Sequence, residues 1–151
     1  MISELIYNLG GWDNNKIYAN DAYVYERGTK VYTGWPAEWK GKVAVPYASD
    51  YGYAMDFSKC TQNLNNYNDN TCTLYNWMKN IMTTSGNNNR WLLTHYPSDS
   101  YRAWGTLASG SVFHRNYDYN AYGIIPVLYL NANVSIISGS GTSSSPYKIE
   151  Y

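Results

Sequence analysis

The chain has 151 residues, of which 44% are hydrophobic and 15% are charged, whereas an average domain has roughly 25% charged residues. Its 11 lysines and arginines balance its 11 aspartates and glutamates, so it lacks the basic surplus with which proteins bind nucleic acids. No apolar run approaches the roughly 18–20 residues of a membrane-spanning helix. Since aromatic residues make up 17% of the chain, it is not disordered, and we expect one folded domain over residues 1–151.

Short tyrosine-rich stretches alternate with glycine and asparagine pairs between residues 5 and 34, among them 17–18, 22–25 and 30–32. This pattern is typical of strands joined by turns. Residues 42–45 predict a further short strand, which ends at Pro46.

One segment predicts a helix. Its apolar residues recur at i, i+3, i+4, i+7 and i+8, which places them on one helical face. They are Leu74, Trp77, Met78, Ile81 and Met82. Thr73 can cap the start of this helix and Gly86 can end it. We expect the apolar face to pack against a sheet.

The C-terminal half predicts strands at 91–94, 103–107, 124–130, 134–137 and 147–149. Pro126 donates no backbone hydrogen bond, so the strand that contains it begins, ends or lies at a sheet edge there. The glycine- and serine-rich residues 139–146 predict a flexible connection. The fold class expected is α+β, with few helices, many short antiparallel strands and long polar loops.

Cys60 and Cys72, the only cysteines, flank a segment too polar for a core. They are compatible with free thiols, half a zinc site or a disulfide. A zinc site needs further ligands, and His95 and His114 lack finger-like spacing. We favour the disulfide, which would place the protein outside the cytosol, with its export segment outside this chain.

The sequence does not indicate an enzyme or a resident cofactor. No Gly-x-Ser-x-Gly motif accompanies its histidines, and its scattered acidic residues carry no catalytic pattern. Asn116, Asp118 and Asn120 place oxygen atoms at alternate positions, as Ca²⁺ loops do, but the glycine and distal glutamate of such loops are missing. We interpret residues 116–120 as an extended segment and assign no metal ligand.

The region between Trp91 and Tyr122 combines tyrosine, histidine and arginine with small polar residues, as antibody paratopes do. The alternative is that these aromatic residues fill a small core. The candidate ligand-binding residues are His95, Tyr96, Ser98, Asp99, Tyr101, Arg102, His114, Arg115, Tyr117, Tyr119 and Tyr122.

Several short sequence motifs occur in a recognisable order over nearly the whole chain. They lie at 7–12, 26–29, 39–43, 49–54, 76–77, 91–94, 123–130 and 139–147. Together they resemble surface-exposed domains of gut Firmicutes and their phages, found behind pilin-like or other export segments. They are also similar to the C-type-lectin-like fold of formylglycine-generating-enzyme-type proteins and of the variable proteins of diversity-generating retroelements. Ile125 stands where this family usually has arginine.

The resemblance implies the Cys60–Cys72 disulfide, an extracellular or cell- or virion-surface location, and ligand contacts just before the final core strands. It implies neither sulfatase activation nor calcium-dependent sugar binding, because the motifs of both are missing. We therefore expect a recognition domain for adhesion or receptor binding, whose partner is a protein or glycan on another surface. The alternative is the structural head of a pilin-like or tail-fibre subunit.

Overall fold

The computed structural model describes residues 4–9, 19–27, 38–60, 70–82, 89–96, 101–117, 121–130 and 132–150. Within these residues, four short helices accompany seven short strands, and all strand pairs are antiparallel. The elements are β1 (Leu5–Asn8), α1 (Ala19–Arg27), β2 (Glu38–Gly41), α2 (Ala48–Tyr53), α3 (Asn70–Leu74), α4 (Trp77–Met82), β3 (Arg90–His95), β4 (Arg102–Thr106), β5 (Val112–Asn116), β6 (Ser135–Ser138) and β7 (Lys148–Glu150). The expected α+β class is confirmed.

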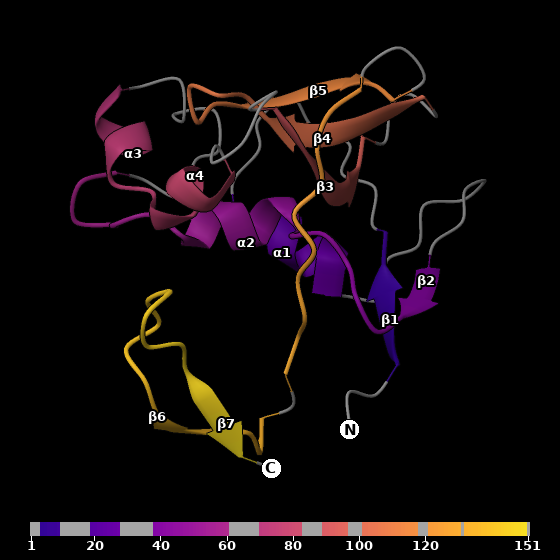
Figure 1. The fold of residues 1–151 in the computed structure, drawn as a ribbon. Helices are drawn as coiled ribbons and strands as arrows, with labels where there is room; N and C mark the ends of the chain where they lie inside the picture. The colour runs from indigo at the N-terminus through magenta and orange to yellow at the C-terminus, as the bar shows by residue number, and fades with distance from the viewer. Residues whose placement is uncertain are drawn as a thin grey trace.

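The strands form three small sheets, ordered β1-β2, β3-β4-β5 and β6-β7. Figure 1 shows β3-β4-β5 lying over α1 and α2, with β1-β2 beside them. The β6-β7 hairpin stands apart at the end of the segment 121–130, and its strand residues are all exposed. Among the described helices, none is long and apolar enough to cross a membrane.

The predicted strand at 22–25 is wrong, because these residues belong to α1. Ala19, Ala22 and Glu26 lie one turn or two apart and are the buried residues of this helix. The two alanines allow α1 to pack closely against α2, and this tertiary contact overrides the strand propensity of Tyr23 and Val24.

The predicted helix at 73–82 is divided into α3 and α4 at Asn76. The Asn76 side chain accepts hydrogen bonds from the backbone N–H of Met78 at 3.0 Å and of Lys79 at 3.3 Å, so Asn76 rather than Thr73 caps α4. Its amide also donates to the carbonyl of Tyr51, which ties α4 to α2. Gly86 lies outside the described residues.

The strands expected at 91–94, 103–107, 134–137 and 147–149 are confirmed as β3, β4, β6 and β7, with ends shifted by one or two residues. Residues 42–45 and 124–130 do not form ladders. They meet only at the bridge Ala44–Val127, whose two backbone hydrogen bonds are 3.0 and 2.8 Å long. Pro126 has no N–H to extend this pairing. The segment at 139–146 contains a turn, with positive φ at Gly139 and Gly141.

The disulfide between Cys60 and Cys72 is confirmed. Both cysteines are buried in the main core, together with Tyr51, Met82 and Trp104. The covalent bond joins the turn that follows α2 to α3, so it anchors a five-residue helix that has little surface to bury on its own.

Glu26 is the centre of a buried hydrogen-bond network between α1, α2 and β3. It is 1% exposed, and its carboxyl group accepts from the hydroxyl groups of Ser49 and Thr94 and from the backbone N–H of Ser49. The Thr94 hydroxyl in turn accepts from the backbone N–H of Ala48 at 2.8 Å. Burial raises the pKa of Glu26, and the hydroxyl groups only partly oppose that shift.

We predict that Glu26 makes the protein less stable as the pH rises. Because its folded-state pKa lies above the ordinary value of 4.5, its contribution is complete below that value and is lost as pH rises through the raised pKa. The variant Glu26→Gln keeps the shape of the side chain but cannot ionise. The Tm of the variant minus the Tm of the parent protein should therefore increase from about pH 4.5 to about pH 8. A Tm difference that stays constant over this range would contradict the prediction.

Reduction of the disulfide should destabilise the fold. The bridge closes a loop with a sequence separation of 12, so its loss costs about 3 kcal/mol through the greater entropy of the unfolded chain. Thermal melts with and without a thiol reductant measure this, and the variant Cys60→Ser/Cys72→Ser should melt like the reduced protein in both conditions. If the reductant also lowered the Tm of that variant, the destabilisation would have a cause other than loss of the disulfide.

Candidate binding surface

The register of β3-β4-β5 brings several candidate residues to one end of the sheet. Arg102 lies opposite Asn116, and its Nε atom donates to the Asn116 side-chain oxygen at 3.0 Å. The backbone N–H of Tyr117 donates to the carbonyl of Tyr101 at 3.0 Å. His95, at the end of β3, pairs with Ala103. Residues distant in sequence therefore meet where the three strands reach the same edge.

Three of the candidate side chains at this end form an exposed group, which we call the binding surface: Tyr101, Arg115 and Tyr117. The tyrosines are 59% and 53% exposed, and Arg115 is exposed as well. The Arg115 guanidinium lies over the ring of Phe113, 5.5 Å from its centroid, and donates to the His114 carbonyl at 3.1 Å. The arginine is thus oriented by a buried ring while its charge stays accessible.

Tyr96 and His114 lie on the side of the sheet that faces the core. Their rings stack with centroids 3.9 Å apart, and both meet the buried Trp104 edge-on at 5.4 and 5.3 Å. They are half-buried, so in the described structure they act as packing residues, and their contact with a ligand stays a prediction.

Tyr122 lies on the outer side of the sheet. Its ring packs against Trp91 at 4.8 Å and against Phe113 at 5.4 Å. Among these rings, Phe113 is the one that also lies under Arg115. The candidates Ser98, Asp99 and Tyr119 lie outside the described residues, as do positions 118–120 of the segment with alternating oxygen atoms.

Much of the predicted loop region is strand instead. The strand β5, whose residues include His114 and Arg115, was not predicted from the sequence. Within the described ranges, no three histidine, cysteine, aspartate or glutamate side chains gather as a metal site would require. The groups that the binding surface presents to a ligand are therefore two phenol rings and one guanidinium.

A polar cluster that was not predicted from the sequence is formed by Arg27, Asp50, Tyr47 and Tyr129. Arg27 pairs with Asp50 at 2.8 Å and lies 4.1 Å from the Tyr47 ring centroid. Asp50 also accepts from the Tyr129 hydroxyl and from the backbone N–H of Tyr47, the latter at 2.9 Å. Burial and the neighbouring Asp50 raise the pKa of Tyr129. No local pattern could reveal this cluster, since its members are up to 102 positions apart.

Comparison of the chain with protein-family models, with curated proteins and with solved structures finds no match.

The two classes of aromatic residue on this sheet should respond differently to truncation. Tyr117→Ala removes an exposed ring and should change the free energy of unfolding by no more than about 0.5 kcal/mol. Phe113→Ala removes a buried ring that packs on Gly105 and Tyr122, and should cost about 3 kcal/mol. Denaturant titrations of both variants measure the difference, and equal losses would show that Tyr117 is part of the core.

Proposed function

We propose that this protein is a non-enzymatic extracellular recognition domain with a C-type-lectin-like fold, which binds a protein or glycan through the binding surface. The observation that carries the proposal is the exposure of Tyr101 and Tyr117 beside the oriented Arg115 at the end of a hydrogen-bonded sheet. Tyrosine and arginine dominate the energetics of many recognition surfaces.

The strand ends support this function because they limit the entropy lost on binding. A tyrosine side chain has two rotatable bonds, and here the backbones of Tyr101 and Tyr117 are joined by a hydrogen bond. Because the backbone at these positions is already fixed, binding orders only the side chains, which improves affinity.

The disulfide supports an extracellular location, since such bonds persist in oxidising compartments. The same location suits a domain that presents aromatic side chains to another surface. The resemblance to exported surface domains leads to the same proposal.

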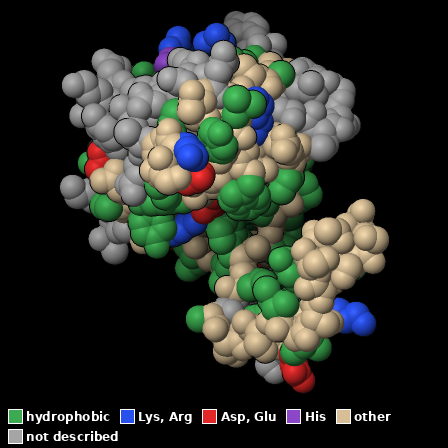
Figure 2. Space-filling view, turned by 90° about the vertical axis from the view of Figure 1, so that its left-hand side faces the viewer, with side chains coloured by type: hydrophobic (Ala, Val, Ile, Leu, Met, Phe, Trp, Pro, Cys, Tyr) green, Lys and Arg blue, Asp and Glu red, His purple; other side chains and the backbone are tan. Residues whose placement is uncertain are grey.

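One observation favours self-assembly as the second candidate function. The β6-β7 hairpin exposes four large apolar side chains on a lobe that stands apart from the body (Figure 2). These are Ile136, Ile137, Tyr147 and Ile149. Isolated two-stranded hairpins are only marginally stable in water, so a neighbouring subunit that covers this lobe would stabilise it. Sedimentation at several protein concentrations distinguishes the two functions, because only self-assembly gives a species that grows with concentration.

The test of recognition is a triple variant, Tyr101→Ala/Arg115→Ala/Tyr117→Ala, compared with the parent protein on a panel of immobilised glycans and bacterial surface proteins. We expect the variant to keep its Tm and to bind at least tenfold more weakly to any partner of the parent protein, because more than 1.4 kcal/mol of contact energy is lost.

A matched control changes exposed residues on the hairpin, Ile137→Ala/Tyr147→Ala, and should keep binding at the parent level. Unchanged binding by the triple variant would refute the assignment of the surface. Loss of binding by both variants would show that the hairpin is part of the recognition site.

A further inference from the structure

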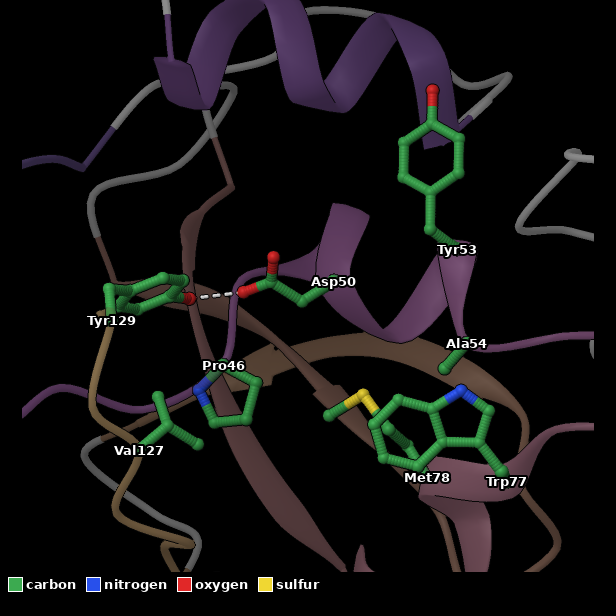
Figure 3. A pocket seen from close by; sticks show the side chains of 8 residues that line it. All are labelled: Pro46, Asp50, Tyr53, Ala54, Trp77, Met78, Val127 and Tyr129. Carbon is green, nitrogen blue, oxygen red and sulfur yellow. Dashed lines mark hydrogen bonds between the residues drawn. The ribbon is translucent and has the colours of Figure 1, made fainter. Parts of the chain in front are cut away.

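We propose that a second site, distinct from the binding surface, binds an alkylammonium group. It is a cavity of about 350 Å³ between α2, α4 and the segment 127–129 (Figure 3). The cavity lies on elements other than β3-β4-β5, so the proposal does not rest on the proposed function. Its volume falls within the range of small-molecule sites.

The walls of the cavity are apolar and its rim is aromatic. Pro46, Ala54, Met78 and Val127 supply carbon surfaces. Trp77 is 63% exposed although tryptophan is usually well buried, and Tyr53, whose ring packs on Tyr23 and Phe57, is 39% exposed. Figure 3 shows Trp77 and Tyr53 on one side of the cavity and Val127 and Tyr129 on the other. Such walls accept a slender apolar chain, and the exposed ring of Trp77 favours a cation.

The polar end of the cavity consists of Asp50 and the Tyr129 hydroxyl, and it accepts hydrogen bonds. Tyr129 donates its single hydroxyl hydrogen to Asp50 and its oxygen accepts from Arg27, so toward a ligand this oxygen can only accept. A carboxylate has about four acceptor positions. Arg27, Tyr129 and the Tyr47 N–H fill three of them, which leaves one position on a side chain that is 27% exposed.

The orientation of the Arg27–Asp50 ion pair gives this cavity a negative character. Asp50 lines it, whereas Arg27 lines a neighbouring cavity of about 250 Å³ on the other side of Tyr129, together with Glu26 and Tyr47. Among the described residues that line the larger cavity, none is a lysine or an arginine. A ligand carboxylate would therefore approach the negative end of the Arg27–Asp50 pair, whereas an ammonium group would approach a carboxylate oxygen, a phenol oxygen and the ring of Trp77.

These features together select a primary ammonium at the end of a short alkyl chain. The same chemistry is carried by a free alkylamine and by the lysine side chain of a peptide. The ammonium would donate to Asp50 and Tyr129, and its methylene groups would lie between Met78 and Val127, with Trp77 and Tyr53 along the rim.

Calorimetric titration of the full chain with n-butylammonium, n-butanol and butyrate tests the charge preference. We expect n-butylammonium to bind at least tenfold more tightly than n-butanol, and butyrate not to bind, with weakening of the ammonium complex at high salt. Equal affinity for the amine and the alcohol would overturn the proposal, and so would absence of amine binding. A parallel titration with N-acetyl-lysine methylamide identifies the source: tighter binding than n-butylammonium indicates a lysine side chain, and weaker binding indicates a free amine.

Two variants locate the site. Trp77→Leu should weaken n-butylammonium about five- to tenfold through loss of the aromatic face, with little change in Tm because Trp77 is exposed. Asp50→Asn should abolish the preference for n-butylammonium over n-butanol. The matched control is Trp39→Leu, which changes an exposed tryptophan on β2 that lines neither cavity, and it should leave the affinity unchanged. If Trp77→Leu binds n-butylammonium like the parent protein, the assignment of this cavity is refuted.

Discussion

The buried carboxyl group of Glu26 constrains how the helices meet the three-stranded sheet. It takes hydrogen bonds from α2 through Ser49 and from β3 through Thr94, while its own backbone belongs to α1. A carboxyl group removed from water is stable only where such partners surround it, so the three elements have one arrangement that satisfies it. The apolar contacts of Ala22 and Tyr51 then fill the space that this arrangement leaves. The fold thus gains specificity from a polar group whose burial raises its pKa and opposes its ionisation.

The sheet divides its aromatic residues between two tasks. Trp104 and Phe113 are buried, and they hold Tyr96, His114 and Tyr122 in ring contacts on the two sides of the strands. Tyr101 and Tyr117 extend beyond this packed part into solvent. The packed rings fix the strands from which the exposed side chains extend, and this arrangement suits the proposed recognition function.

The ion pair between Arg27 and Asp50, near α2, affects both the charge of its cluster and the character of the cavities beside it. It neutralises the net charge of the cluster, and the ring of Tyr129 beside it separates two cavities of different electrostatic character. Because both side chains are partly exposed, the ion pair contributes little to stability. For a ligand, the positions of the two charges matter more than the strength of the pair. Because Asp50 lines one cavity and Arg27 the other, each cavity meets a different end of the ion pair, and this difference can distinguish ligands of similar shape.

The sequence alone was sufficient for the α+β class and for β3, β4, β6 and β7, because alternating or continuous apolar runs bounded by turn residues are local signals. It favoured the Cys60–Cys72 bond, which the structure contains. It could not establish α1 or the break at Asn76, because alanine contacts and a side-chain bond to the Tyr51 carbonyl override local propensity there. Nor could it separate the exposed Tyr101 from the packed Tyr96, since one residue type suits both environments. That separation, and the meeting of Arg27, Asp50 and Tyr129, arise only when distant segments of the chain pack together.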